Sequence, residues 1–504
     1  MSNPQKLHII SYINCIYNAI KQNIILFAIV VGVNIWQFDF SEIRDYIGLG
    51  IVLMFFIISL VSQILEVYST RYWLEDDHFI VTHGVFNKNR KELNVRKIQS
   101  FETTQGVIDQ LVNGVKLQIK TPSDGVELET ITKSQSQMIE QSIRNKQLEL
   151  LQKGDLQLEN KKHDLQDTQS LDNEQTDNQN IIFKMSFKTL LLMALTSGAV
   201  GVTFAALSPI FNSVEDFIPW DSLTHGILSW VNSAFKIVFV ITVALIIVSY
   251  IVGTAIMMIR YYHYTVTQSH SQLKVSYGLL NVKNITVPTD RLQAVVEKQS
   301  LLRKLFGYTS IHFIITSDSD VTSEVDVSTK GRVMILPFIK QHEAYRILAD
   351  LVPEMDFIKI DKGMPLRSFH RHFFIFSVII LILASIGTYF WSVWSFGIAA
   401  VLILIRILHA WVYFKCSGMA QNDSEIAVSE LTFLTLNSYY FKKDKILEIE
   451  TEQHPFLQRA RLATINFILA KGAIFQGVTL KFEDEHKVKN VTSTFLRGES
   501  NDNL

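Results

Sequence analysis

Two ionisable side chains lie inside a long apolar run in the last third of the chain. Arg406 and His409 are about one helical turn apart, so a helix would place both on one face. Ionisable groups are costly inside a bilayer, where they usually line a path or meet a partner. Glu66, at the end of an earlier apolar run, is the candidate partner. The alternative is that Arg406 extends toward the headgroups and Glu66 only marks a span end.

A second group of candidates is basic and lies in polar segments. Near an anionic surface each such charge contributes ~1 kcal/mol, so these residues are candidates for binding lipid headgroups or a protein partner. The alternative is a set of solvated loops that follow the usual cytoplasmic excess of Lys and Arg. The candidates are Lys88, Arg90, Lys91, Arg96, Lys97, Arg291, Arg303 and Lys304.

The sequence offers little for catalysis or metal binding. His370 and His372 are two apart, so on a helix they would point in different directions. Cys15 and Cys416 fit no metal or redox spacing and are expected to be buried thiols. Hydrolase, zincin and nucleotide-binding motifs do not occur in their required contexts. With a formal net charge of −1, nucleic acid is not an expected partner. We predict a non-enzyme without metal or cofactor.

Six apolar runs are long enough to cross a bilayer, which takes about 20 residues. Short connections join the first run to the second and the fifth to the sixth, a longer one, Asn212–Ser233, joins the third to the fourth, and long polar stretches separate the pairs. This spacing predicts three transmembrane hairpins. The runs are Gln22–Phe38, Tyr46–Leu65, Lys188–Phe211, Ala234–Ile259, Phe373–Trp391 and Phe396–Phe414.

Lys and Arg are concentrated at the ends of the runs that adjoin the long polar segments, and the hairpin tips have few. This distribution predicts a cell membrane protein whose termini and soluble segments are cytoplasmic. The N-terminus has no recognisable cleavage site, so the first span is expected to remain. Isoleucines at helical spacing in Leu7–Ile20 predict a helix on the membrane surface before that span.

A repeated element follows each hairpin. In two copies a glycine, Gly84 or Gly278, precedes a basic-aliphatic-glutamine triplet that ends in Gln99 or Gln293. A further glutamine follows six positions later, and the second copy continues into LLRKLFG, which ends in Gly307. The third copy lacks the early glycine and has Lys445-Ile446-Leu447 and then Gln453. The glycines are expected at tight turns with positive φ or at places of close backbone packing.

The repeats alternate between apolar and polar residues, as strands with one buried face do, for example at Val115, Leu117 and Ile119. Helical stretches, Gln135–Leu151 and Lys340–Leu351, close the first two copies. The third copy ends in RGESNDNL, where we expect no closing helix, so this unit is expected to be either incomplete or completed by a neighbour. The fold class expected is α-helical membrane hairpins plus small all-β barrels, each with a C-terminal helix, in three repeats.

These motifs resemble the bacterial pleckstrin-homology-like (PH-like) domain of the second type, and the threefold arrangement resembles the YdbT-like membrane protein family. The resemblance implies bent antiparallel barrels, no established catalytic residue, and often a smaller single-domain membrane partner, with self-association as the alternative. It also implies a contribution to tolerance of membrane-active peptides.

The expected domain order follows from the repeats. From Glu102 to Ile182 the chain has no aromatic residue, and its later part is acidic, which predicts a flexible linker. The segments are 1–66 (surface helix and first hairpin), 67–152 (first PH-like domain), 153–183 (linker), 184–260 (second hairpin), 261–355 (second domain), 356–415 (third hairpin) and 416–504 (third, degenerate domain).

Repeated binding-type domains without catalytic groups favour a non-enzymatic membrane scaffold. Its cytoplasmic domains would bind protein or inner-leaflet lipid, in envelope stress or peptide tolerance. The alternative is a transporter component in which Arg406, His409 and Glu66 line a path between hairpins. A membrane-embedded enzyme is a third reading.

Overall fold

The computed structural model describes residues 3–34, 43–85, 87–121, 125–159, 180–197, 234–269, 272–316, 331–390, 394–471 and 474–501. The chain divides into two compact units. The first contains Met1–Asn180, Thr267–Pro288 and Ser317–Lys330, and the second contains Ile181–Val266, Thr289–Thr316 and Gly331–Leu504. The boundary therefore falls within β8 (Asn180–Lys184) and β9 (Thr265–Ser269) and divides the second repeat.

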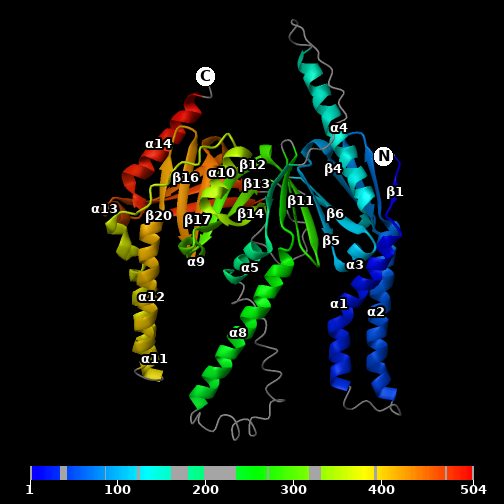
Figure 1. Cartoon of the computed structure of the whole chain (residues 1–504), viewed down its shortest axis with the longest axis horizontal. Coiled ribbons are helices and arrows are strands. Elements are labelled where there is room, and N and C mark those ends of the chain that lie inside the picture. Colours follow the sequence, from blue (N-terminus) through cyan, green and yellow to red (C-terminus); the bar gives the residue numbers. More distant parts are fainter. Residues whose placement is uncertain are drawn as a thin grey trace. The chain divides into compact units, whose positions relative to one another are not determined.

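The first unit begins with two helices that run side by side, α1 (Ile10–Asn34) and α2 (Ile43–Ser69) (Figure 1). A four-stranded sheet follows in the order β1-β2-β3-β4, and then three strands and a closing helix. The elements are β1 (Gln5–Lys6), β2 (Arg71–Glu75), β3 (His78–His83), β4 (Asn89–Asn94), η1 (Val95–Lys97), β5 (Ser100–Gln105), α3 (Val107–Leu111), β6 (Gly114–Lys120), β7 (Gly125–Thr132) and α4 (Lys133–Glu159).

The core of the first unit lies between its two sheets and the closing helix. Val115, Leu117 and Ile119 enter this core, as their alternation predicts, but the intervening Gln118 and Lys120 are also buried, so the prediction of only one buried face is wrong for this strand. Ile139 and Ile143 on α4 pack into the same core, and Gln147 on that helix donates to the carbonyl oxygens of Val95 and Ile98. The helix thereby closes one side of the sandwich.

The second unit contains the rest of the second repeat and the whole third repeat. Its larger sheet has the order β14-β13-β12-β17-β16-β15, and its smaller one β18-β19-β20. The elements are α5 (Phe187–Leu195), α8 (Ala234–Arg260), η3 (Thr289–Arg291), β12 (Leu292–Ser300), α9 (Leu301–Leu305), β13 (Tyr308–Ile315), β14 (Arg332–Lys340), α10 (Gln341–Leu351), η5 (Leu366–His372), α11 (Phe374–Phe390), α12 (Trp394–Cys416), β15 (Gly418–Gln421), β16 (Glu425–Thr432), β17 (Thr435–Lys442), η6 (Lys443–Lys445), β18 (Ile446–Glu452), α13 (Pro455–Arg459), β19 (Leu462–Lys471), β20 (Ile474–Asp484) and α14 (Glu485–Asn501).

Strands pair across successive repeats, which sequence reasoning did not predict. We expected each barrel to be closed by its own strands. Instead β5 of the first repeat pairs with β11 (Val282–Pro288) of the second, which in turn pairs with β10 (Gln272–Tyr277). In the second unit β12 of the second repeat pairs with β17 of the third.

Two helices among the described residues are long and apolar enough to cross a membrane, Leu366–Phe390 and Trp394–Cys416. Most of their large apolar side chains are exposed, including Phe374, Ile375 and Leu383. A soluble protein would not leave such a surface in water, so lipid is the fitting solvent. Leu53–Ser69 and Ile246–Arg260 are shorter apolar stretches. Residues 35–38, 198–211 and 391 of the expected spans lie outside the described residues.

Two expectations about the chain ends are wrong. Leu7–Ile20 is not a separate surface helix, because α1 continues without a break from Ile10 into the expected first span, and Ser11 and Cys15 are buried against the first sandwich. The third repeat does have a closing helix, α14, whose Val488 and Val491 enter the core. Of the expected linker, residues 160–179 lie outside the described part of the chain.

The repeat glycines occupy turns with positive φ, as expected, at +97° in Gly84 and +116° in Gly278. They also satisfy the packing alternative, because a Cβ on Gly278 would lie 2.0 Å from the carbonyl oxygen of Asn281. The third repeat has a shorter turn between β16 and β17, in which Phe433 takes φ +56°. This difference explains why it lacks the glycine.

We expect Gly278→Ala to destabilise the protein by at least about 2 kcal/mol, because it adds a backbone clash to the positive φ. Gly307→Ala is the control, since Gly307 has φ +70° but no atom within 4 Å of an added Cβ. Thermal unfolding in detergent should show the larger loss of apparent Tm for Gly278→Ala. Equal losses would contradict this account of the turn.

Candidate functional site: apolar tips at the junctions between repeats

The two junctions between repeats use the same strand register. Ile285, six residues before Arg291, pairs with Glu102, five residues after Lys97. Tyr439, six residues before Lys445, pairs with Val296, five residues after Arg291. Because Lys97, Arg291 and Lys445 are equivalent in the repeats, both junctions join the same two repeat positions. The register is therefore a property of the repeat.

The second glutamine of the motif has one structural role in all three repeats. The side chains of Gln105, Gln299 and Gln453 donate to the carbonyl oxygens of Gly114, Tyr308 and Leu462, at 2.7, 3.0 and 3.1 Å. Each bond crosses the connection that contains a short helix, α3, α9 or α13. The glutamine thus fixes this connection, whereas the first glutamines, Gln99 and Gln293, lie at or beside the start of a strand.

The short helices carry apolar side chains that are largely exposed. Leu111 in α3 is 80% exposed, Leu305 in α9 is 78% exposed, and Phe456 in α13 is 62% exposed. Phe306, just after α9, is also exposed. Isolated apolar residues on a surface need no explanation, but their recurrence at one place in three repeats marks this connection for a common environment.

A second apolar element lies beside each of the first two short helices. It is the pair of residues after the turn glycine position, Leu279-Leu280 in the second repeat and Phe433-Leu434 in the third, and all four are exposed. The side chain of Gln110 donates to the carbonyl oxygens of Leu279 and Leu280, both at 3.0 Å. The amide of Leu301 donates to the carbonyl of Leu434 at 3.1 Å. We call each combination of short helix and following turn a junction tip.

The tip in the second unit lies beside the apolar helices. The His409 ring nitrogen Nε2 is 2.7 Å from the carbonyl oxygen of Phe433, and the Lys304 Nζ lies 2.8 Å from the Cys416 Sγ. His409 is seven residues before the end of α12, which corresponds to about 10 Å along the helix axis. In the first unit, Asn14 on α1 donates to Asp109 of α3 at 3.0 Å. Each tip is therefore held against a helix of an expected hairpin.

A buried polar network stabilises the junction in the second unit. The Tyr345 hydroxyl lies 2.7 Å from both the Glu297 carboxylate and the Tyr440 hydroxyl, and Gln341 donates to the same carboxylate at 2.8 Å. Burial raises the pKa of Tyr345 well above its usual value, and the charge of Glu297 raises it further. The hydroxyl therefore stays protonated and donates, which joins α10 and β12 of the second repeat to β17 of the third.

The comparison with protein families decides what these repeats are. A family model described as bacterial PH domain matches residues 24–147, 223–352 and 376–497. The chain belongs to this bacterial PH domain family. The first and third matches begin inside α1 and α11, so the family unit includes part of an apolar helix as well as the strands and the closing helix.

A relative that matches nearly the whole chain is described as a transmembrane protein. The chain is 24% identical over 493 residues to the UPF0699 transmembrane protein YdbT of Bacillus subtilis (strain 168), which covers 95% of this chain and 96% of the relative. The expected resemblance to the YdbT-like family is thus confirmed, and the chain is a membrane protein with repeated PH domains. No solved structure matches it significantly.

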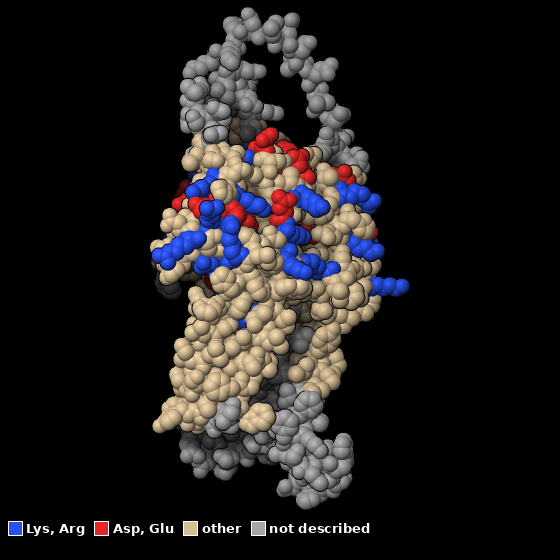
Figure 2. All heavy atoms as spheres, turned by 90° about the vertical axis from the view of Figure 1, so that its left-hand side faces the viewer, with Lys and Arg blue, Asp and Glu red and all other residues tan. Residues whose placement is uncertain are grey.

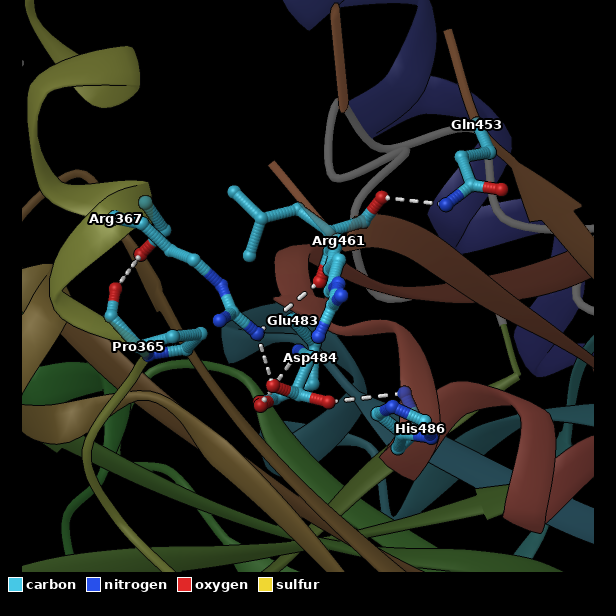
Figure 3. Close-up of polar contacts among 9 residues, drawn as sticks. Pro365, Arg367, Gln453, Arg461, Glu483, Asp484 and His486 are labelled. Atoms are coloured by element: carbon cyan, nitrogen blue, oxygen red, sulfur yellow. Dashed lines mark hydrogen bonds and ion pairs between the residues drawn. The ribbon is translucent and has the colours of Figure 1, made fainter. Parts of the chain in front are cut away.

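The third PH domain is fastened to the entry of its hairpin. Figure 3 shows the Arg367 guanidinium, just before α11, directed at the Asp484 carboxylate and at the Arg461 carbonyl oxygen. Asp484 also accepts from the amide of His486 at 2.9 Å, and Arg371 donates to the Phe456 carbonyl of α13 at 2.9 Å. These contacts fix the domain relative to the base of α11.

The basic candidates do not form one site. Arg90 pairs with Glu92 at 2.7 Å, Arg96 lies 3.8 Å from Asp77, and Lys91 donates to the Gly125 carbonyl. Arg303 and Lys304 are part of α9 in the second-unit tip. Lys88, Lys97 and Arg291 are exposed. Binding of lipid or protein by these residues stays a prediction.

The intramembrane candidates each have a local environment. The Arg406 guanidinium lies 4.5 Å from the centre of the Phe376 ring and donates to the His372 carbonyl at 3.4 Å. His409 contacts the tip, as described above. Glu66 lines a cavity of about 280 Å³ in the first unit together with His83, Lys91, Glu127 and Glu129. The transport path proposed from the sequence stays a prediction.

Sequence reasoning missed the junction tips, although a signal was present. An apolar pair follows the glycine position at the same offset in each repeat, as Val85-Phe86, Leu279-Leu280 and Phe433-Leu434. Each pair interrupts polar turn residues, where apolar side chains are unusual. Phe86 itself lies outside the described residues.

We expect Tyr345→Phe to destabilise the second unit by about 1–3 kcal/mol, because the buried Glu297 carboxylate loses a donor. Tyr308→Phe is the matched control, since the Tyr308 ring stacks on Phe338 with 4.3 Å between ring centroids and the stacking would persist. Thermal unfolding in detergent measures both. A loss for Tyr308→Phe as large as that for Tyr345→Phe would contradict the role given to the hydroxyl network.

Proposed function

We propose that the protein is a non-enzymatic membrane scaffold whose PH domains rest on the inner leaflet through the junction tips. The observation that carries this proposal is the contact of His409, inside α12, with the exposed turn at Phe433. A tip that reaches this far along a membrane helix enters the boundary between headgroups and acyl chains, which extends about 5–10 Å into the leaflet.

The apolar side chains of the tip supply the driving force. Moving a fully exposed Leu or Phe side chain out of water is worth about 1.5–3 kcal/mol. Leu305, Phe306 and Phe433 are each more than half exposed, so together they stabilise contact with lipid by several times RT. If the tip remained in water, the same three side chains would contribute no such stabilisation.

The distribution of charge favours the same orientation. Figure 2 shows Lys and Arg gathered mainly in a band that borders a large part of the molecule without charged residues, drawn in tan, with Asp and Glu mostly farther from it. Arg371 and Lys415 lie at the ends of the two apolar helices. Basic residues in this position attract anionic headgroups and favour the cytoplasmic side.

Cytoplasmic orientation, three complete hairpins and tolerance of membrane-active peptides stay predictions. A path lined by Arg406 and His409 has less support than the scaffold, because His409 is engaged by the carbonyl of Phe433.

Spin labels on single cysteines test the depth of the tips. In a variant lacking both native cysteines, Leu305→Cys or Phe433→Cys would be labelled and the protein reconstituted into bilayers. We expect these labels to be accessible to oxygen and shielded from a water-soluble relaxation agent, because both positions lie in lipid.

Phe475→Cys is the control. Phe475 is 70% exposed, and it follows the far end of β19, whose start adjoins α13. A label there should be accessible to the water-soluble agent. The proposal fails if the labels at positions 305 and 433 are as accessible to that agent as the label at position 475.

A further inference from the structure

In the first and third repeats, one junction strand lacks the cross-repeat partner that its equivalents have. Among the described strands, β4 is hydrogen-bonded to β3 on one side only, and β18 to β19 on one side only. Their equivalents in the other repeats, β11 and β17 for β4, and β5 and β12 for β18, all take part in a junction. The described strands thus include one open half-junction of each kind.

Burial shows that these edges differ from their joined equivalents. Most residues of β12 and β17 are buried, whereas most residues of β18 and half of those of β4 are exposed. Leu447 in β18 is 55% exposed. An open strand edge is a template for pairing with another chain.

The tips are incomplete in the same way. An internal tip combines a short helix with the turn of the following repeat. Phe456 of α13 and Val85 after Gly84 are exposed, and each belongs to an element whose equivalents in the other repeats form an internal tip. The two unmatched halves are therefore complementary parts of one further junction.

The charges on the two edges have opposite sign. Glu448, Glu450 and Glu452 alternate along β18, so they lie on one face of the strand. Arg90, Lys91 and Glu92 lie on β4, so that strand carries a formal net charge of +1. Charges on an edge strand oppose pairing with an edge of like sign, so β18 is unsuited to pair with another β18, and β4 with another β4.

We propose that β18 of one copy of this chain pairs with β4 of a second copy, in the register of the internal junctions. That register places Lys91 opposite Glu450 and Arg90 opposite Thr451, since Asn284 is opposite Thr103 and Ser438 opposite Glu297 at the internal junctions. Such contacts are heterologous and join copies head to tail into a ring or an open row. The inference does not depend on lipid contact by the tips.

Cysteines at the proposed register test the junction. In a background with Cys15→Ala and Cys416→Ala, one tagged copy would carry Arg90→Cys and a differently tagged copy Thr451→Cys. Directly opposite cysteines in an antiparallel pair are within disulfide distance. We expect mild oxidation of the purified, reconstituted mixture to give covalent dimers that contain both tags.

The matched control replaces Thr451→Cys by Glu450→Cys, which moves the thiol to the other face of the strand. Dimer formation should fall roughly ten-fold, because the two thiols then point apart. A single chain with both Arg90→Cys and Thr451→Cys should give a ladder of linked copies. Circular dichroism of each variant confirms that it is folded.

Three results would overturn the proposal. One is the absence of two-tag dimers in the purified protein above the Glu450→Cys control. Another is a link formed only within a single copy of the double variant. The third is a link, in native membranes, to a different protein with none between copies, which would assign these edges to a separate partner.

Discussion

The antiparallel ladders that join β5 to β11 and β12 to β17 are the interactions on which the rest of the structure depends. They make one sheet out of strands from two repeats. Because their register is the same at both junctions, each short helix lies beside the turn of the next repeat, although the hydrogen bonds between them differ. The junction tips and the Tyr345 network are consequences of this pairing.

Register matters more here than the strength of individual hydrogen bonds, each of which adds only about 0.5–1.5 kcal/mol net. A slip by one residue would turn every side chain of a strand to the opposite face. In β12 that slip would remove Val296 from the core and place Glu297 there. The buried contacts of Glu297 with Tyr345 and Gln341 oppose such a slip.

Local features of the fold could be predicted from the sequence, whereas pairing between repeats could not. Alternation at Val115, Leu117 and Ile119 identifies a strand, and Gly84 identifies a turn, because both depend on neighbouring residues. Alternation does not determine which strand lies alongside, so pairing of Glu102 with Ile285 was not foreseen. The apolar positions Val488 and Val491 of α14 were overlooked for a different reason, since polar residues dominate its sequence.

In the candidate site, too, the residues could be recognised from the sequence but their partners could not. Arg406 and His409 were recognised from their type and setting, but the carbonyl that meets His409 comes from Phe433 in a turn of the following domain. Arg303 and Lys304 were expected on a basic surface, and the structure places them in α9 beside exposed apolar residues. The partners of these side chains are distant in sequence, so periodicity and composition could not supply them.

The pairing between repeats is tested most directly by disulfides within one chain. With both native cysteines removed, Thr103→Cys with Asn284→Cys samples the cross-repeat ladder, in which the two side chains are 3.2 Å apart. Arg90→Cys with Thr103→Cys samples a barrel closed within its own repeat. We predict an intrachain disulfide for the first pair and none for the second, detected by mass spectrometry of the monomer. The reverse result would contradict the account.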